Sequence, residues 1–307
     1  MAVALVTGAN GFLGKYVTRE ILNRGDKVIG LTRGSSILCE SGLPLSLKPT
    51  VFEICKILEE TGAAFVYHLA GTSNASDLET LYQANVIYAQ TVLSASGMAK
   101  SPPKVVLIGS AAEYGTPIAS DHVTREEDVC RPMSAYGISK LAQTHHGLAA
   151  SAAGLHVTVA RLFNPIGAGS PSSTALGSFV RQIAAMSDQG GILRTGSLRS
   201  VRDFIDVSEA ARIIAKLPLL PNLEGNVYNV CTGAGTRLLD VVSQLIEASG
   251  LKVEHHVESH IRGTSDIDTV IGSNERLRTL GLSVSQTDIR SVLEAMLQHE
   301  RSIRRKS

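Results

Sequence analysis

Tyr136 and Lys140 are the two residues whose types and spacing most directly suggest chemistry. They stand four positions apart in the segment 134–154, whose apolar spacing predicts a helix, so both side chains would share one helix face. A tyrosine has an ordinary pKa of about 10, and a neighbouring ammonium group would lower that pKa by favouring the phenolate. A tyrosine tuned in this way can pass a proton to or from a carbinol or carbonyl oxygen. Ser110 would add a hydroxyl group, because it ends a predicted strand and ligands bind at the strand ends of open α/β sheets.

Three glycines near the start of the chain predict a phosphate-binding loop. Gly8, Gly11 and Gly14 follow a predicted strand at 2–7 and open a predicted helix at 12–25. Gly8 would permit a tight turn, Gly11 would let the backbone approach a pyrophosphate, and Gly14 would let the helix pack closely. The N–H groups and the positive dipole end of that helix would then bind the phosphates. The alternative is a glycine-rich turn without a ligand.

The end of the second predicted strand bears on which dinucleotide is bound. The segment LTRGSS (31–36) has no carboxylate that could accept hydrogen bonds from a ribose 2′-hydroxyl. Arg33 could instead pair with a 2′-phosphate. We therefore expect NADP as the cofactor and keep NAD as the alternative, in which Arg33 is an exposed arginine in a turn.

Strand and helix patterns alternate regularly over the first half of the chain. The strands are continuous apolar runs, which are typical of a parallel sheet buried on both faces. We therefore expect an α/β fold with a Rossmann-type, doubly wound parallel sheet. The predicted strands are 2–7, 26–32, 63–70, 103–110 and 155–163, and the predicted helices are 12–25, 50–62, 77–97 and 134–154.

The second half of the chain has shorter elements separated by loops rich in glycine, serine and proline, such as 167–177. We expect a dinucleotide-binding domain at 1–165, followed by a smaller C-terminal α/β substrate lobe at 166–300. Some segments of this lobe should return to the Rossmann sheet. The basic end of the chain, 301–307, is predicted to be a solvated, frayed tail.

The composition argues against several classes of protein. The formal net charge is +1 over 307 residues, so no bulk charge points to nucleic acid or to a membrane surface. No apolar run approaches the roughly 20 residues that span a bilayer, and the apolar start lacks the basic region of a signal peptide. The four cysteines form no CxxC pattern and indicate reduced thiols in a cytoplasmic protein. The adjacent histidines at 145–146 and 255–256 would point apart, and we predict no metal.

The motifs around these residues resemble the extended short-chain dehydrogenase/reductase family, also called the NAD-dependent epimerase/dehydratase family, whose members act on nucleotide sugars. The resemblance covers nearly the whole chain and rests on TGANGFLG (7–14), HLAG (68–71), Asn85, GSAAEYG (109–115), RPMSAYGISK (131–140) and RLFNPIGAG (161–169). It implies a catalytic trio of Ser110, Tyr136 and Lys140. It also implies cofactor contacts from Gly8, Asn10, Gly11, Phe12, Leu13, Gly14, Arg33, Leu69, Ala70, Gly71, Tyr136, Lys140 and Phe163.

Three later segments resemble the GDP-4-dehydro-6-deoxy-D-mannose reductases. They are SVRDFIDV (200–207), GNVYNVCTGAGTRLLDVV (225–242) and TVIGSNERL (269–277). By this resemblance Arg202 and Arg262 would clamp the nucleotide diphosphate, as suits guanidinium geometry. The alternative for each arginine is a surface salt bridge. The substrate contacts implied in full are Ser110, Ala111, Asn164, Phe179, Arg202, Arg262 and Asp266.

The residues after Ser110 bear on which reaction this scaffold performs. In the 4,6-dehydratases of the family, acidic residues follow the catalytic serine or threonine and act as acid and base. Here Ala111 and Ala112 occupy those positions and cannot carry a proton. Strand alternation would turn the side chain of Glu113 the other way. Reduction of a keto-sugar or epimerisation through a transient ketone therefore remains.

The resemblance implies NAD(P)H-dependent reduction of the 4-keto group of an NDP-4-keto-6-deoxyhexose, GDP-linked by preference. Tyr136 would protonate the developing alkoxide, Lys140 would hold the ribose and lower the tyrosine pKa, and Ser110 would donate a hydrogen bond. The alternative is an NDP-sugar 4-epimerase with tightly bound NAD. A non-enzymatic dinucleotide-binding protein is disfavoured by the intact trio. By analogy with the family we expect a homodimer formed through the helices 77–97 and 134–154.

Overall fold

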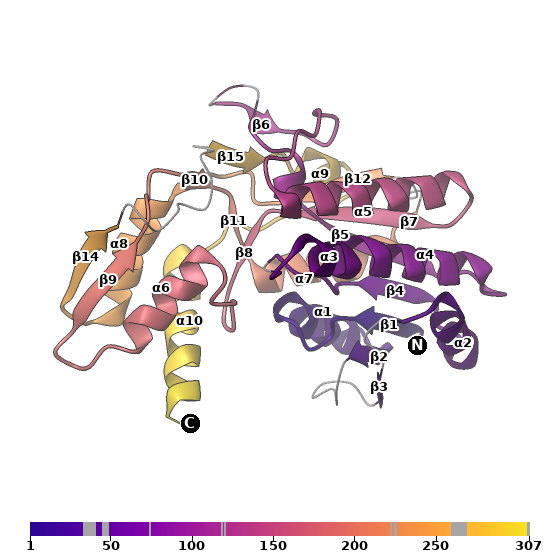
Figure 1. The fold of residues 1–307 in the computed structure, drawn as a ribbon, viewed down its shortest axis with the longest axis horizontal. Helices are drawn as coiled ribbons and strands as arrows, with labels where there is room; N and C mark the ends of the chain where they lie inside the picture. The colour runs from indigo at the N-terminus through magenta and orange to yellow at the C-terminus, as the bar shows by residue number, and fades with distance from the viewer. Residues whose placement is uncertain are drawn as a thin grey trace.

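The centre of the fold is a parallel sheet covered by helices on both faces (Figure 1). The structure is a computed structural model that describes residues 1–32, 41–44, 49–73, 75–117, 119, 121–221, 223, 226–258 and 269–305. Within these residues the sheet contains β1 Val3–Thr7, β2 Lys27–Thr32, β3 Ser41–Pro44, β4 Phe65–His68, β5 Lys104–Ser110, β7 Val157–Leu162 and β12 Asn226–Val230. The strand order is β12-β7-β5-β4-β1-β2-β3.

The strand sequences explain why this sheet is parallel and buried. All six residues of β7 and five consecutive residues of β5 are buried, so these strands need cover on both faces. Every strand pair in the sheet is parallel. The doubly wound Rossmann-type sheet that the apolar runs predict is therefore confirmed.

Helices cover the two faces of the sheet. One face carries α1 Phe12–Asn23 and α7 Val207–Lys216, and the other carries α2 Val51–Thr61, α4 Tyr88–Met98 and α5 Ala135–Ala152. Val17 and Ile21 of α1 share a core with Val6 of β1, whereas Ile54 of α2 shares the opposite core with Leu5. Burying each such aliphatic side chain contributes about 1.5–3 kcal/mol. The alternation along β1 thus fixes helices on both sides.

The predicted helix 77–97 is interrupted by a wider turn. Asp77 caps α3 Leu78–Tyr82 by accepting a hydrogen bond of 2.7 Å from the backbone N–H of Thr80. A π-helical turn, η1 Gln83–Ile87, then leads into α4 without a break. Such turns occur often at functional sites because they displace one residue from the regular helix surface.

The later part of the chain contributes both to the main sheet and to smaller sheets. β12 joins the main sheet beside β7, so the prediction that later segments return to it is confirmed. The described residues form three further sheets, in the orders β13-β10-β15-β6, β11-β8 and β14-β9. Their strands are β6 Val123–Thr124, β8 Asn164–Ile166, β9 Gly191–Thr195, β10 Val201–Arg202, β11 Phe204–Asp206, β13 Thr236–Arg237, β14 Val253–Val257 and β15 Thr269–Gly272.

A smaller group of helices packs at the left of Figure 1 around its own apolar core. It consists of α6 Ala175–Ala184, α8 Leu238–Ser249 and α10 Ile289–Arg304, while η3 Leu217–Leu219 and α9 Glu275–Thr279 lie by the main sheet. The predicted frayed tail from residue 301 is wrong for its first residues. α10 continues to Arg304, and the guanidinium of Arg301 donates a hydrogen bond of 2.9 Å to the carbonyl oxygen of Ser249.

Two further observations concern the described residues only. Cys55, Cys130 and Cys231 are free thiols, and the paired histidines His145 and His146 are both exposed on α5. Among the helices in the described ranges, none combines the length and the apolar character that crossing a membrane requires.

Candidate active site

The glycine loop forms a close turn between β1 and α1. Gly8 has φ +70°, and a Cβ atom there would lie 2.8 Å from the backbone nitrogen of Ala70. A Cβ atom on Gly14 would overlap the carbonyl oxygen of Gly8 and lie 2.9 Å from the backbone of Ala9. The amide of Gly11 donates a hydrogen bond of 2.8 Å to that same oxygen. The loop therefore leaves a backbone cradle at a helix N-terminus, which fits the phosphates of a dinucleotide.

The end of β4 lies against this loop. Thr7 Oγ1 accepts a hydrogen bond of 3.1 Å from the backbone N–H of Ala70 and lies 3.0 Å from His68 Nδ1. Leu69, Ala70 and Gly71 thus follow directly beside the glycine loop. Arg33, which the sequence predicts to bind a 2′-phosphate, lies outside the described residues.

The predicted catalytic trio lies on β5 and on the first turns of α5. Ser134 caps α5 by accepting a hydrogen bond of 3.0 Å from the backbone N–H of Gly137. A Cβ atom on Gly137 would overlap the carbonyl oxygen of Ala112, so this turn of α5 seats directly on the turn after β5. The side chains of Tyr136 and Ser110 are hydrogen-bonded to each other. The structure therefore brings the predicted tyrosine and serine together.

The protonation of Tyr136 differs from the prediction. Burial raises the pKa of Tyr136, the hydrogen bond with Ser110 lowers it, the charge of Glu113 raises it, and the net direction is upward. The predicted lowering of this pKa by Lys140 is wrong here, because desolvation of the phenolate is the largest effect. At neutral pH the phenol therefore keeps its proton and can act as a proton donor.

The ammonium group of Lys140 is held within the protein. The residue is only 5% exposed, and Nζ donates a hydrogen bond of 2.7 Å to Gln143 Oε1. Gln143 Nε2 in turn donates 2.9 Å to the carbonyl oxygen of Ile108 in β5. Burial lowers the pKa of Lys140 to about 8, and the carboxylate of Glu113 opposes that effect. Gln143 is a residue that sequence reasoning missed, although its position three after Lys140 places it on the same helix face.

The turn after β5 contains an ion pair that the sequence did not predict. Strand alternation does not apply to Glu113, because the chain leaves β5 at Ser110 and forms a 3₁₀ turn, η2 Ala111–Glu113. The Glu113 side chain is fully buried, and its Oε2 lies 2.7 Å from Arg161 Nε. Arg161 sits in the apolar run LHVTVARLF of β7. A charged residue within such a run is the signal for a buried partner, since an unpaired charge there would be very unfavourable.

Asn85 joins the segment after β4 to α5. Its Oδ1 accepts a hydrogen bond of 2.8 Å from the N–H of Thr72, and its Nδ2 donates 2.9 Å to the Thr72 carbonyl and 2.9 Å to Ser139 Oγ. Ser139 Oγ donates 2.7 Å to the carbonyl oxygen of Tyr136. The π turn η1 therefore presents the family asparagine to the helix that carries the trio.

The predicted substrate residues fall into two groups. Asn164 and Ala111 follow the ends of the paired strands β7 and β5: Asn164 Nδ2 donates a hydrogen bond of 2.9 Å to the carbonyl of Asp203, and Ala111 packs on the small cluster that contains Phe163. Arg202 is buried in β10 and donates 2.8 Å to the carbonyl of Val201. Phe179 lies in the core of the helical group, on α6. Two further predicted residues, Arg262 and Asp266, lie outside the described residues.

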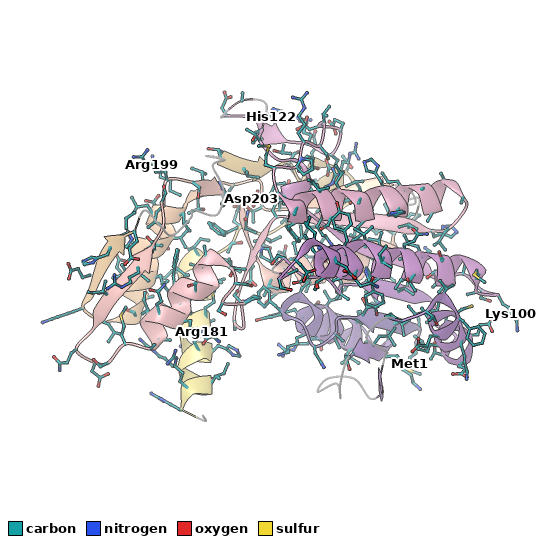
Figure 2. The ribbon with its side chains drawn as sticks, viewed as in Figure 1. Met1, Lys100, His122, Arg181, Arg199 and Asp203 are labelled. Carbon is teal, nitrogen blue, oxygen red and sulfur yellow. The ribbon has the colours of Figure 1, made fainter. Side chains whose placement is uncertain are left out.

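Asp203 is a buried carboxylate that sequence reasoning missed, between the two parts of the molecule (Figure 2). Its Oδ1 accepts hydrogen bonds from the backbone and hydroxyl of Thr232, at 2.8 and 2.7 Å. Its Oδ2 accepts from the backbone of Gly233 at 2.9 Å and of Gly272 at 3.3 Å. Burial raises the pKa of Asp203. A carboxylate directly before the apolar pair Phe204 and Ile205 in SVRDFIDV is the signal that could have identified it.

His68 predicts how stability depends on pH. Burial lowers its pKa from 6.5 to about 3, and Lys140 adds to the shift. Between these two pKa values, His68 binds more protons in the unfolded chain than in the folded chain. Its contribution to the free energy of unfolding is therefore greatest above pH 6.5 and falls as the pH is lowered toward 3. The slope from this residue should reach about 1.4 kcal/mol per pH unit. Urea unfolding at pH 7 and pH 5 measures it. His68→Asn should flatten the dependence, and equal slopes for both proteins would refute the assignment.

Comparison with known proteins agrees with this geometry. The model of the NAD dependent epimerase/dehydratase family matches residues 4–231. The dTDP-6-deoxy-L-talose 4-dehydrogenase (NAD(P)(+)) of Kitasatospora kifunensis is 29% identical over 81% of this chain and 80% of its own length. The GDP-6-deoxy-D-mannose reductase of Pseudomonas aeruginosa is 30% identical over 76% of this chain and 78% of its own. The structure of RMD from Pseudomonas aeruginosa complexed with NADPH superimposes with a TM-score of 0.82 at 25% identity, covering 99% of this chain and 98% of that one.

The family match extends over more than half of the chain and includes the glycine loop, the trio and β12. It also spans the buried Glu113 and Arg161, whose pairing the sequence alone does not reveal. The chain therefore belongs to the NAD dependent epimerase/dehydratase family.

Proposed function

We propose that this chain reduces the 4-keto group of an NDP-4-keto-6-deoxyhexose with NAD(P)H, and that GDP is the favoured nucleotide. The observation that carries the proposal is the close seating of the first turn of α5 on the turn after β5, which brings the protonated Tyr136 phenol beside Ser110. Reduction of a ketone needs a proton donor at that place. The names of the two curated relatives, which act at C4 of 6-deoxyhexoses or on such sugars, support the substrate class.

The glycine cradle fits a nicotinamide dinucleotide. Gly8, Gly11 and Gly14 would hold its phosphates, with Asn10, Phe12, Leu13, Leu69, Ala70, Gly71 and Phe163 beside it. When bound, the reduced dinucleotide would supply the hydride. Lys140 would hold its ribose, and NADPH is the form we expect to be preferred, as the structural relative with NADPH supports.

The chain's own groups would handle the proton. Tyr136 would give its phenolic proton to the oxygen that becomes the C4 hydroxyl. Ser110 would donate a second hydrogen bond to that oxygen as its negative charge develops. Solvent would then return a proton to the tyrosinate that is left behind.

Dehydration by the route of the 4,6-dehydratases is not proposed. Ala111 and Ala112 carry no ionisable group, and both oxygens of Glu113 already accept hydrogen bonds within the protein. We therefore propose hydride transfer at C4 of the sugar rather than dehydration.

We further propose that residues 1–165 hold the dinucleotide and residues 166–300 mainly hold the nucleotide sugar. Arg202 and Arg262 would bind the diphosphate of the substrate, Asp266 would be a further substrate contact, and Phe179 would line the nucleotide pocket. Asn164 would contact the sugar. The cytoplasmic location that the cysteine spacing indicates stays a prediction.

A homodimer is also proposed, formed through α3, α4 and α5. Leu78 and Ile87 are 62% and 48% exposed before and within η1, and Ile138 on α5 is 46% exposed. Apolar side chains of this kind on neighbouring helices favour a covered face. Analytical ultracentrifugation measures the mass directly, and a monomer at micromolar concentration would refute the proposal.

The purified protein mixed with GDP-4-keto-6-deoxymannose and NADPH or NADH tests the reaction. Stoichiometric loss of the reduced-nicotinamide absorbance, faster with NADPH, is the expected result. Absence of oxidation, together with NAD released only on denaturation, would instead favour a 4-epimerase, and UDP-sugars would then be tested.

A further inference from the structure

The buried carboxylate of Glu113 touches the two elements that carry the predicted catalytic trio, β5 and α5, and the neighbouring strand β7. Its Oε1 accepts a hydrogen bond of 2.7 Å from the backbone N–H of Ser110, at the end of β5. Its Oε2 accepts 2.8 Å from Thr144 Oγ1 on α5 and 2.7 Å from Arg161 Nε on β7. Thr144 lies one helical turn after Lys140, on the same face as that residue. One side chain therefore sets β5, α5 and β7 relative to each other.

The surrounding residues are shaped to admit this carboxylate. A Cβ atom on Gly109 would lie 2.6 Å from Glu113 Oε1 and 3.0 Å from Arg161 Cγ. A glycine at 109 is thus needed for the carboxylate to approach the strand end. Ser110 Oγ accepts 3.2 Å from the N–H of Ala112, so the same 3₁₀ turn fixes both the backbone and the side chain of the serine.

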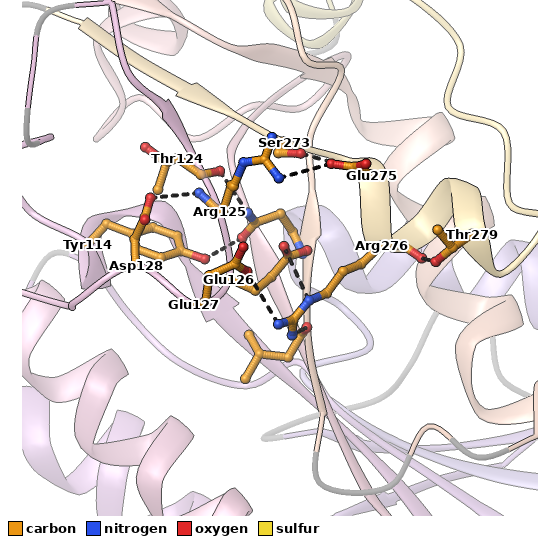
Figure 3. Close-up of polar contacts among 12 residues, drawn as sticks. Tyr114, Thr124, Arg125, Glu126, Glu127, Asp128, Ser273, Glu275, Arg276 and Thr279 are labelled. Atoms are coloured by element: carbon orange, nitrogen blue, oxygen red, sulfur yellow. Dashed lines mark hydrogen bonds and ion pairs between the residues drawn. The ribbon is translucent and has the colours of Figure 1, made fainter.

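Arg161 is held from its other side by the ring of Tyr114, whose own polar contacts appear in Figure 3. Its guanidinium lies 4.6 Å from the ring centre of Tyr114, whose hydroxyl donates 2.6 Å to Asn229 Oδ1. Asn229 Nδ2 donates 3.1 Å to the carbonyl of Thr124, and the Asn229 N–H donates 2.8 Å to Glu126 Oε1. The ion pair is therefore anchored to β12 and to the segment around β6.

Stability alone gives little reason for such a pair. Replacing a buried ion pair with apolar residues is often neutral or stabilising, because desolvation of both charges is unfavourable. Glu113 bonds, however, to the backbone of the residue whose hydroxyl contacts Tyr136. This placement indicates that Glu113 fixes the position of Ser110 rather than adding to the free energy of unfolding.

We propose that Glu113 is a positioning residue, which holds Ser110 and α5 so that the Ser110 hydroxyl and the Tyr136 phenol address the same substrate oxygen. This inference rests on the proposed reduction. Arg161 acts through Glu113 by holding its carboxylate in place.

Two double variants separate positioning from charge. In E113Q/R161M the side-chain amide oxygen at position 113 can still accept a hydrogen bond from the Ser110 N–H. In E113L/R161M the side chain at position 113 has no acceptor for that hydrogen bond. Both variants lack the ion pair, so neither leaves a buried unpaired charge. We expect kcat to fall by no more than about fivefold in the first and about 100-fold in the second, as displacement of a reacting group by about 1 Å would produce. The KM for the dinucleotide should stay within about twofold in both.

A second readout needs no substrate. The tyrosinate absorbance of each double variant is measured as a function of pH. The same titration of that variant with Tyr136→Phe added is then subtracted, and the difference gives the pKa of Tyr136. Lys140, one helical turn after Tyr136 on α5, and His68 on β4, on which Lys140 acts, are unchanged in both variants. The pKa should be higher in E113L/R161M, because the hydrogen bond from Ser110 is lost there.

Three outcomes decide the matter. Equal kcat in the two double variants, once corrected for the folded fraction, would overturn the inference. An inactive wild type with the expected difference in tyrosine pKa would overturn the proposed reduction but keep the positioning. If E113L/R161M does not fold, Thr144→Val removes one hydroxyl from the carboxylate and should lower kcat by about threefold to tenfold; an unchanged kcat would refute the role.

Discussion

Replacement of Tyr136 with phenylalanine is expected to lower kcat by about 1000-fold, which lies within the range for removal of a positioned general acid. The phenyl ring keeps the packing of Tyr136 on α5 and removes only the proton donor. Because the glycine loop is untouched, the dissociation constant of the dinucleotide should stay within about twofold. Stopped-flow single turnovers with NADPH measure the chemical step, and fluorescence titration measures the binding of the dinucleotide.

Tyr82→Phe is the matched control for this variant. Tyr82 lies on α3 with 36% of its surface exposed, and the change deletes the same hydroxyl group from a residue that has no assigned role in the site. Its kcat should equal that of the wild type. A Tyr136→Phe enzyme that keeps more than a tenth of the wild-type kcat would place the proton donor elsewhere.

The turn at the glycine loop and the shared helix face of Tyr136 and Lys140 could be predicted from the sequence because both depend on local geometry. Gly8, Gly11 and Gly14 act through the backbone conformation of one turn, and Tyr136 and Lys140 share a face through helix geometry alone. The continuous apolar runs likewise require a sheet with two covered faces, whatever the loops between them do.

The parts that could not be predicted depend on contacts between distant residues. The pKa of Tyr136 rises because other elements bury it, and no spacing in the sequence reveals the extent of that burial. Glu113 and Arg161 are 48 positions apart and meet only once β5 and β7 pair. Arg301 remains helical because its guanidinium reaches Ser249 on another helix, whereas its basic neighbours in the sequence indicate a solvated end.

The trio and the ion pair beneath it follow different physical rules. The predicted trio can be recognised partly by residue type, because only a few side chains can transfer a proton or stabilise an oxyanion. Its members are Ser110, Tyr136 and Lys140. The ion pair of Glu113 and Arg161 can be recognised by its burial instead, because each charge needs an opposite charge as its partner once both are removed from water. A residue that positions a catalytic group is therefore found more readily from unexplained buried charge than from a motif.

Substitution of Gly14 with alanine is expected to disrupt the dinucleotide site. The new Cβ atom would overlap the carbonyl oxygen of Gly8 and crowd the backbone of Ala9, so the loop must move. Overpacking of this kind destabilises by about 1–3 kcal/mol. Displacement of the loop amides by about 1 Å should weaken dinucleotide binding about 100-fold.

Thermal and chemical unfolding with and without NADPH measure both effects of Gly14→Ala. A ligand at 100 times its dissociation constant stabilises the wild type by about 2.7 kcal/mol, and a 100-fold weaker site leaves about 0.4 kcal/mol at the same concentration. Gly97→Ala is the matched control: Gly97 lies within α4, and a Cβ atom there would meet nothing within 4 Å. That variant should gain up to about 1 kcal/mol from helix propensity and keep the full response to NADPH. A Gly14→Ala protein that responds to NADPH as strongly as Gly97→Ala would show that the cradle does not hold the dinucleotide.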